Sequence, residues 1–326
     1  MAYIQVVAGI VLLVVAGDFL VRGSVSLALR AGLSKLVIGL TIVAFGTSAP
    51  EMLVGIDAVL KGAPTLALGN VVGSNIANAL LVVGVPALLA PVACCAPKVG
   101  RNLAMMLIAS VLFIALAYDG QFAWQEGLIL LTGLTCFLAY SATARKACPA
   151  ETAAQMVEME ELDRKPDGYG IALLCLAGGI IGLALGADLL VIGSVEIARE
   201  FGISEAVIGL TLVALGTSLP ELVACVMAAV RGHSEVAIGN VIGSNIFNLL
   251  AIMGVAPLFG AIPVPDSFLR VDLWVMLGSS LLLIPFVKIR KQVGRVGGAA
   301  MVALYLGYMI YLANSAESAA VMGLPL

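Results

Sequence analysis

Two glutamates lie deep in stretches of the sequence that are otherwise apolar or small, and each ends the same short motif. Glu51 ends GTSAPE, and Glu221 ends GTSLPE 170 residues later. An acidic side chain at the centre of an apolar helix costs on the order of 2.5–3.5 kcal/mol, so such a group usually faces a partner or a wet cavity. Protonation or a buried base would also reduce this cost, but no lysine or arginine lies inside the apolar segments that carry or directly follow the motifs. The pattern therefore predicts that cations from solution balance the two carboxylates.

Further oxygen donors surround each glutamate. Pro50 cannot donate a hydrogen bond to the carbonyl group of Gly46, and glycine itself weakens a helix, so backbone oxygens are left free there. Thr47 lies one helical turn before Glu51 and on the same face. Carboxylate, hydroxyl and carbonyl oxygens are hard ligands that suit Ca²⁺ or Na⁺ better than transition metals. One copy alone would be typical of an ordinary helix kink, whereas two copies, each with its glutamate, indicate a cation site.

A polar stripe follows each motif. The segment GNVVGSNIANAL spaces Asn70, Ser74 and Asn78 four residues apart, so the three side chains share one helical face. The stripe recurs in GNVIGSNIFNLL, at Asn240, Ser244 and Asn248. Glycines in both segments have the GxxxG spacing that lets helices approach closely. The amides could hold helices together, ligate the cation, or do both. Asn75 and Asn245 lie off the stripe and are assigned to helix packing or backbone capping.

The elements that carry these motifs are those of a membrane protein. Of the 326 residues, 61% are hydrophobic and 11% are charged, and the mean hydropathy is +1.11, whereas a soluble domain carries roughly 25% charged residues. Apolar runs of about 18 residues or more can each cross a bilayer as a helix. They predict an all-α integral membrane fold with ten spans, over residues 4–22, 36–60, 66–90, 102–118, 123–143, 169–190, 206–230, 236–260, 270–287 and 297–314.

The two halves of the chain are copies of one another. Aligning each residue with the one 170 positions later requires no gap between Asp18/Asp188 and Val85/Val255, and about half the positions are identical, which indicates an internal duplication. Five spans precede the second copy, so the copies enter the membrane from opposite sides. Such inverted repeats are typical of secondary transporters, with the site near the midplane where the repeats meet. The predicted organisation is a five-helix repeat over 1–143, a cytoplasmic linker over 144–168 and a second five-helix repeat over 169–326.

Basic residues predict the orientation. If the N-terminus is outside, 14 of the 17 lysine and arginine residues fall at inward-facing connections or span ends, and the other 3, Lys61, Arg199 and Arg270, face outward. The positive-inside rule then places both termini outside and the 144–168 loop in the cytoplasm. At about 25 residues, this loop is too short for a folded regulatory domain and is interpreted as a solvated linker.

The motifs resemble those of the cation/Ca²⁺ exchanger superfamily, specifically its prokaryotic sodium/calcium exchangers. GTSxPE and GNxxGSNxxN look like the repeats of that family, and the resemblance covers essentially the whole chain. It implies ten helices around four central sites, with Ca²⁺ bound by Glu51, Glu221, Thr47 and Thr217. The sodium ligands that it implies are the same glutamates with Ser48, Ser74, Asn78, Ser218, Ser244 and Asn248 and the carbonyl groups of Ala44 and Ala214.

Asn248 is where the chain departs from some members of the superfamily. Several of them, notably the K⁺-dependent exchangers, carry an aspartate at this position. The amide removes a charge and favours exchange without K⁺. Members that exchange H⁺ for Ca²⁺ carry related but different motifs.

Charge constrains the mechanism independently of the family. Two buried carboxylates carry about two negative charges, which one Ca²⁺ or two Na⁺ ions neutralise. Ions that share ligands compete, and competition at one alternately exposed site is antiport, with at least two Na⁺ per Ca²⁺. The leading interpretation is therefore a Na⁺/Ca²⁺ antiporter in the cell membrane, functional as a monomer, with Ca²⁺, Na⁺ and lipid as partners and no cofactor or nucleic acid.

Two other mechanisms remain open. In an H⁺/Ca²⁺ antiporter the glutamates would carry protons. A cation channel would need weak binding along a pore, whereas a compact cluster with two carboxylates binds cations tightly. An enzyme is not expected, because the sequence contains no nucleophile–base pair or transition-metal cluster.

Three further acidic residues are weaker candidates. Asp18 and Asp188 are matched between the repeats. Asp18 has Arg22 one turn later, whereas Asp188 has Ile192, and both aspartates are interpreted as structural. The third, Asp57, corresponds to a methionine in the second copy and is a weak candidate for a vestibule.

Overall fold

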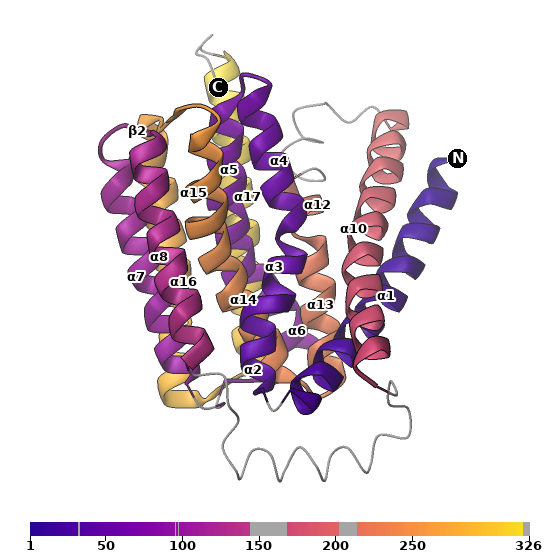
Figure 1. Ribbon diagram of the computed structural model, residues 1–326. Coiled ribbons are helices and arrows are strands. Elements are labelled where there is room, and N and C mark those ends of the chain that lie inside the picture. The colour runs from indigo at the N-terminus through magenta and orange to yellow at the C-terminus, as the bar shows by residue number, and fades with distance from the viewer. Residues whose placement is uncertain (32, 95, 97, 144–167, 202–213, 322–326) are drawn as a thin grey trace.

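The computed structural model describes residues 1–31, 33–94, 96, 98–143, 168–201 and 214–321. Its long elements are all helices, gathered in one bundle in which α1 begins and α17 ends at the same face (Figure 1). Four strands of two residues each lie in connections between helices and form two antiparallel pairs. β1 (Val92–Ala93) pairs with β4 (Gln292–Val293), and β2 (Gln121–Phe122) pairs with β3 (Ile262–Pro263).

The first half consists of long and short α-helices with two π-helical turns among them. They are α1 (Ala2–Arg30), α2 (Lys35–Ile38), the π-helix η1 (Gly39–Val43), α3 (Ala44–Thr47), α4 (Ala49–Leu60), α5 (Pro64–Ala77), the π-helix η2 (Asn78–Val82), α6 (Val83–Leu89), α7 (Val99–Ala117) and α8 (Trp124–Thr143).

The described second half repeats the order of the first from its long first helix to its π-helix at Asn248, and differs after that. Its elements are α10 (Gly168–Glu200), α12 (Ala214–Thr217), α13 (Leu219–Val230), α14 (Ser234–Phe247), the π-helix η4 (Asn248–Ile252), α15 (Met253–Val255), the 3₁₀ turn η5 (Ala256–Leu258), the π-helices η6 (Phe268–Asp272) and η7 (Phe286–Arg290) with α16 (Leu273–Leu281) between them, and α17 (Arg295–Val321).

The molecule is a multi-pass membrane protein. Among the described residues, seven helices are long and apolar enough to cross a membrane, and the bent pair formed by residues 35–47 and 49–60 would make an eighth. α8 and α12–α13 correspond to the fifth and seventh predicted spans, but residues 206–213 of the seventh lie outside the described part, as does nearly all of the 144–168 linker. The count of ten spans stays a prediction.

The first helix is longer than its predicted span, which ended at residue 22. α1 continues to Arg30, and residues 23–28 are buried. A Cβ atom at Gly23 would lie 2.5 Å from the backbone nitrogen of Leu176, so only a glycine lets α1 approach α10 this closely. Tertiary packing against α10 therefore extends the helix beyond its apolar stretch.

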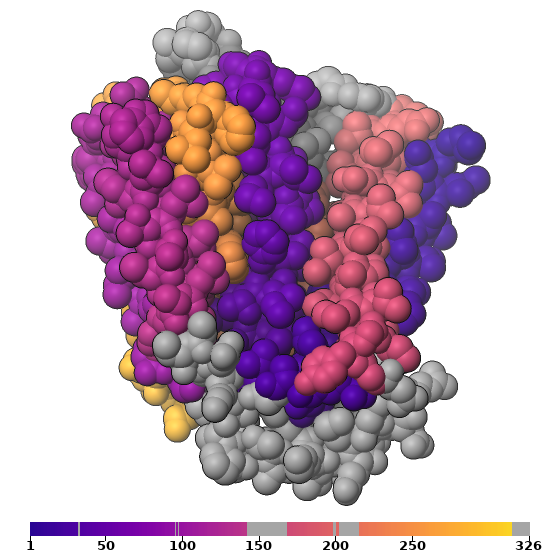
Figure 2. Space-filling view, in the orientation of Figure 1, coloured from indigo at the N-terminus to yellow at the C-terminus, as the bar shows by residue number. Residues whose placement is uncertain are grey.

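Burial separates central helices from peripheral ones. The spans over Pro64–Leu89 and Ser234–Leu258 are 78% and 89% buried, whereas the other five long spans are only 17–44% buried. The two central spans are those that carry the GNxxGSNxxN segments. Around them, elements of the two halves alternate across one face of the molecule, where α8, α15, α4, α10 and α1 lie in that order (Figures 1 and 2). The halves are thus interleaved around a shared centre.

Candidate ion-binding site

The two GTSxPE motifs break their helices in the same way. In the first copy α3 ends at Thr47, Ser48 has φ −86° and ψ 1°, and α4 starts again at Ala49 with a bend of 40°. In the second copy Ser218 has φ −89° and ψ 1° between α12 and α13. Each motif proline falls in the first turn of the new helix, where its missing N–H leaves no internal bond unmade. The predicted kinks are confirmed at both motifs.

The breaks place both glutamates in the first turns of their helices. Glu51 is the third residue of α4 and Glu221 is the third residue of α13, and each side chain is 0% exposed. Unpaired N–H groups make a helix N-terminus favourable for negative charge. Ser48 of the first motif donates its hydroxyl proton to Oε1 of Glu221 across a distance of 3.0 Å. The serine of one repeat thus contacts the glutamate of the other, and the two motifs form one cluster.

Several buried atoms of this cluster have no hydrogen-bond partner in the described protein. They are both carboxylate oxygens of Glu51, Oε2 of Glu221, Oγ of Ser244, and the amide oxygen and nitrogen atoms of Asn78 and Asn248. Buried polar groups in folded proteins nearly always have a partner. Most of the unpartnered atoms are oxygens that can accept a cation, so the donor set fits a hard cation such as Ca²⁺ or Na⁺.

Asn78 and Asn248 also mark a backbone irregularity. Each is the first residue of a π-helix, η2 and η4, and each side chain is at most 1% exposed. Short π-helical turns inside α-helices are frequent at functional sites. The sequence predicts these asparagines as site residues, but nothing in their spacing predicts the π-helical backbone.

The threonines are held by amides of the opposite repeat. Oγ1 of Thr47 donates to Oδ1 of Asn240 at 3.2 Å, and Oγ1 of Thr217 donates to Oδ1 of Asn70 at 3.3 Å. These two asparagines belong to the polar stripes but are missing from the predicted ligand set. The signal that could have identified them is their place on the same helical face as Ser74 and its counterpart. They form a second layer that orients the threonine hydroxyls.

The remaining predicted residues are located as follows. Ser218 donates its hydroxyl proton to Oγ of Ser74 at 3.5 Å, and both serines are buried. The carbonyl oxygen of Ala44 lies 3.4 Å from Oγ1 of Thr47, as the more distant of two acceptors for the one hydroxyl proton, and is therefore beside the cluster. Ala214 is the first residue of α12, and only its backbone is described.

Asn75 and Asn245 serve packing and capping, as the sequence predicts. Nδ2 of Asn75 donates to the carbonyl oxygen of Val71 at 2.7 Å, and Nδ2 of Asn245 donates to that of Asn75 at 3.4 Å. The second of these bonds joins α14 to α5, so it fixes the two central helices against each other.

The chemistry of the cluster is that of an oxygen site. Among the described residues, no group of three or more His, Cys, Asp or Glu side chains could hold a metal ion. The cluster instead combines two carboxylates with hydroxyl and amide oxygens. This set suits alkali and alkaline-earth cations rather than a transition metal.

Comparison with known proteins gives consistent matches. A family model described as "Sodium/calcium exchanger protein" matches residues 1–143 and 171–314. The putative antiporter CaxA of Alkalimonas amylolytica is 36% identical, covering 96% of this chain and 99% of that protein. The sodium/calcium exchanger MaX1 of Methanosarcina acetivorans is 34% identical, covering 95% and 98%. A solved structure of the sodium-calcium exchanger NCX_Mj, soaked with Na⁺ and Ca²⁺, matches with a TM-score of 0.81 and 33% identity, over 94% of this chain and 96% of that one.

Proposed function

The chain belongs to the sodium/calcium exchanger family, a family of membrane antiporters, and from this membership we propose that it exchanges Na⁺ for Ca²⁺ across the membrane. The observation that carries the proposal is the contact between the two repeats at the GTSxPE motifs. Glu51 and Glu221 are fully buried, and a serine of one motif donates to the glutamate of the other. One compact cluster with two carboxylates can hold one divalent ion or two monovalent ions.

We propose Glu51, Glu221, Thr47 and Thr217 as the Ca²⁺ ligands. Both carboxylates come from helix N-termini, where positive dipole ends also reduce their mutual repulsion. Both threonine hydroxyls lie within hydrogen-bond distance of an asparagine amide oxygen, and a hydroxyl oxygen that donates its proton can still ligate a cation. This arrangement supports the threonine oxygens as Ca²⁺ ligands.

We propose that Na⁺ uses the same glutamates and a wider set of oxygens. This set comprises Ser48, Ser74, Asn78, Ser218, Ser244 and Asn248 with the carbonyl groups of Ala44 and Ala214. Because Ca²⁺ and Na⁺ then share both carboxylates, one Ca²⁺ and the full set of Na⁺ ions cannot occupy the site at the same time. Neutralisation of about two negative charges requires at least two Na⁺ for each Ca²⁺.

The proposal includes a setting for the site. Ten spans form two five-helix repeats, over 1–143 and 169–326, joined by a cytoplasmic linker over 144–168, with both termini outside the cell. The protein works as a monomer in the plasma or inner membrane. Support for this topology comes from the basic residues at the predicted inner connections and from the common face at which α1 begins and α17 ends.

Vesicles containing the purified protein test the exchange directly. Loaded with Na⁺ and diluted into Na⁺-free buffer, they should take up ⁴⁵Ca²⁺, and dissipating the Na⁺ gradient should abolish the uptake. Uptake that ignores Na⁺ but follows a pH gradient would favour the H⁺/Ca²⁺ alternative. Flux that dissipates any Ca²⁺ gradient without a counter-ion would favour a channel.

The two glutamates should be individually essential. Glu51→Gln and Glu221→Gln each remove one of the two charges that balance Ca²⁺, so each variant should lose at least 90% of the Na⁺-dependent uptake, a loss of about 1.4 kcal/mol or more. Asp272→Asn is the matched control, because it removes a buried acid of η6 that is paired with Tyr308 away from the motifs. Full exchange in Glu51→Gln would contradict the shared site.

A further inference from the structure

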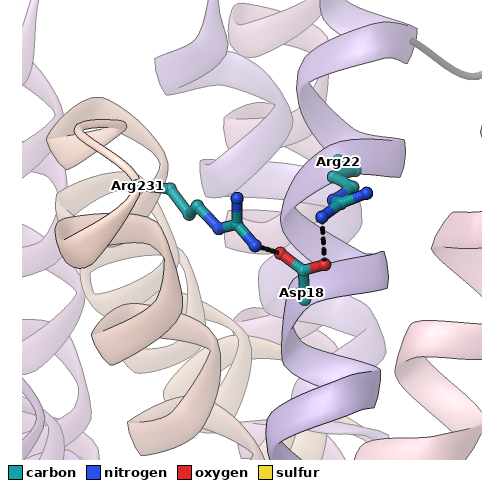
Figure 3. Close-up of polar contacts among 3 residues, drawn as sticks. All are labelled: Asp18, Arg22 and Arg231. Atoms are coloured by element: carbon teal, nitrogen blue, oxygen red, sulfur yellow. Dashed lines mark ion pairs between the residues drawn. The ribbon is translucent and has the colours of Figure 1, made fainter. Parts of the chain in front are cut away.

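An ion-pair network ties α1 to the end of α13. Asp18 on α1 contacts Arg22 one turn later, with 2.7 Å between Oδ2 and the guanidinium nitrogen, and also contacts Arg231 at the C-terminal end of α13 (Figure 3). The Asp18 side chain is 20% exposed. Because Arg231 comes from the second repeat, this network joins the two halves of the protein.

The repeat supplies a second acid–base pair at the opposite face. The 170-residue offset relates Asp18 to Asp188 on α10, and Arg231 to Lys61 at the end of α4. In the structure these counterparts are apart. Nζ of Lys61 is 2.7 Å from Oδ2 of Asp57 in its own helix, and Asp188 is exposed with no ion pair to any described residue. One pair of the symmetric set is therefore formed and the other is open.

Two positions where the repeats differ help to explain which pair is formed. Asp57 offers Lys61 a partner in its own helix, whereas the equivalent position in α13 is Met227 and offers Arg231 none. Arg22 holds Asp18 in place, whereas α10 has Ile192 at the equivalent position. The sequence thus favours the pair formed by Asp18 and weakens its counterpart.

Helix packing differs between the repeats in the same way, because α1 is packed on α13 whereas α10 is not packed on α4 in the corresponding place. A Cβ atom at Gly17 of α1 would lie 2.9 Å from Cγ1 of Val223, so α1 is closely packed on α13. The equivalent face of α4 is not covered in this way, because Leu53, the counterpart of Val223, is 68% exposed. α10 packs instead along α12, α13 and α3.

We propose that Asp18–Arg231 and Asp188–Lys61 are alternate ion pairs, each formed in one of two positions of the α1–α10 helix pair. The inference rests on the proposed antiport, which requires a site exposed to one face at a time. In the position described here, α1 is held against α13. In the other position α10 packs on α4, Lys61 leaves Asp57 for Asp188, and Asp18 leaves Arg231. When one ion pair replaces the other, the second repeat takes the conformation that the first repeat has here, and the first takes that of the second, as an inverted repeat permits.

A cysteine pair can report the second position. Leu53→Cys and Ala187→Cys replace the counterparts of Val223 and Gly17, in a chain whose six native cysteines are replaced by serine or alanine. Asp18→Asn or Arg231→Gln should raise the initial rate of cross-linking about two- to fivefold, the range expected from loss of a partly exposed ion pair. Lys61→Gln or Asp188→Asn should lower that rate. Arg290→Gln, which removes a basic charge near the face at which α13 ends, is the control and should leave it unchanged.

The outcomes separate the two proposals. Cross-linking is measured on purified protein without an ion gradient, so it does not depend on Na⁺/Ca²⁺ exchange. A cross-link that never forms, or one whose rate ignores all four neutralisations, overturns the alternating pairs and leaves the proposed exchange untouched. Absence of exchange together with the expected cross-linking overturns only the proposed function.

A second measurement uses Ca²⁺ uptake by protein that keeps its native cysteines. Asp57→Asn frees Lys61 for Asp188, so the described position of the α1–α10 pair should be populated less often, and the site should be exposed less often at the face to which that position opens it. The Ca²⁺ concentration for half-maximal uptake from that face should rise about two- to fivefold, because apparent affinity falls with the competent fraction. The double variant Asp57→Asn/Lys61→Gln should restore the original value. An unchanged concentration in Asp57→Asn overturns the inference.

Discussion

At the scale of single residues, the direction of each hydroxyl proton decides what a side chain can bind. A threonine or serine hydroxyl has one proton and two lone pairs. Thr47 gives its proton to Asn240, and Ser48 gives its proton to Glu221. Both oxygens therefore keep lone pairs for a cation. The asparagine stripe has a function beyond packing, since it orients hydroxyls of the opposite repeat.

The Thr47–Asn240 pair should behave as a unit. Thr47→Val keeps the shape and removes the oxygen, so Ca²⁺ affinity should fall about 2- to 13-fold, equivalent to about 0.5–1.5 kcal/mol. Thr47→Ser keeps the oxygen and should cost less. In an Asn240→Ala background, Thr47→Val should have a smaller additional effect, measurable by Ca²⁺ titration calorimetry. Strictly additive losses would contradict the coupling.

Asn248 should set the charge balance of the cluster. Asn248→Asp would bring a third carboxylate beside the two glutamates, so one Ca²⁺ or two Na⁺ would no longer neutralise the site. The inhibition of ⁴⁵Ca²⁺ uptake by Na⁺ should then become steeper, because an additional monovalent ion is needed. Asn75→Asp, outside the cluster, is the comparison. An unchanged Hill coefficient for Na⁺ in Asn248→Asp would argue against its place among the ligands.

At the scale of elements, the site depends on how closely α14 approaches the first motif helix. A Cβ atom at Gly243 would lie 2.6 Å from Cβ of Ala44 and would also meet the carbonyl oxygen of Leu40. Backbone atoms cannot move aside as a side-chain tip can. The glycine therefore sets the distance between α14, which carries Asn240 and Ser244, and α3, which carries Thr47.

Gly243→Ala should separate these helices. We expect a loss of most Ca²⁺ uptake and a lower Tm in detergent, because a methyl group forced against backbone typically costs about 1–3 kcal/mol. Gly278→Ala is the matched control, since no described atom lies within 4 Å of a Cβ at Gly278 in α16. That variant should be neutral or slightly more stable, because alanine favours helix by about 1 kcal/mol. Equal behaviour of the two variants would contradict the close approach.

The sequence predicts which elements carry the site, but it predicts less of the local backbone geometry of those elements. Gly46 and Pro50 predict the break at GTSAPE, because both act within one turn of the helix. The π-helical turns at Asn78 and Asn248 and the full length of α1 were not predicted. The extension of α1 depends on a neighbour distant in sequence, Leu176 beside Gly23. The ligand roles of the twelve predicted residues stay predictions, whereas their clustering follows from the duplicated motifs.

At the scale of the whole molecule, the buried hydrophobic clusters of the described residues draw on both halves of the chain. α1 of the first half packs along α10 of the second, and both strand pairs join the halves, β1 to β4 and β2 to β3. The bonds from Thr47, Thr217 and Ser48 also cross between repeats. The predicted boundary at residues 144–168 is thus expected to be a boundary in sequence rather than between independently stable domains.

Two separate chains should therefore reconstitute the protein. Residues 1–156 and 157–326, expressed together, should co-purify through a tag on one of them and restore Na⁺-dependent ⁴⁵Ca²⁺ uptake. Each half expressed alone should yield little folded protein, because its glycine-lined helix face and its strands lack partners. A stable, monodisperse single half would contradict this interdependence.

The interleaving of the halves also bears on the history of the chain. A gene for one half could have produced the same site as two identical subunits inserted in opposite directions, each supplying one glutamate and one asparagine stripe. Such a pair would have to treat both faces of the membrane alike. Only after duplication could Asp57 diverge from Met227, and Arg22 from Ile192, and fusion then keeps the two different copies together. Joining the two copies in one polypeptide is what allows the transporter to distinguish one side of the membrane from the other.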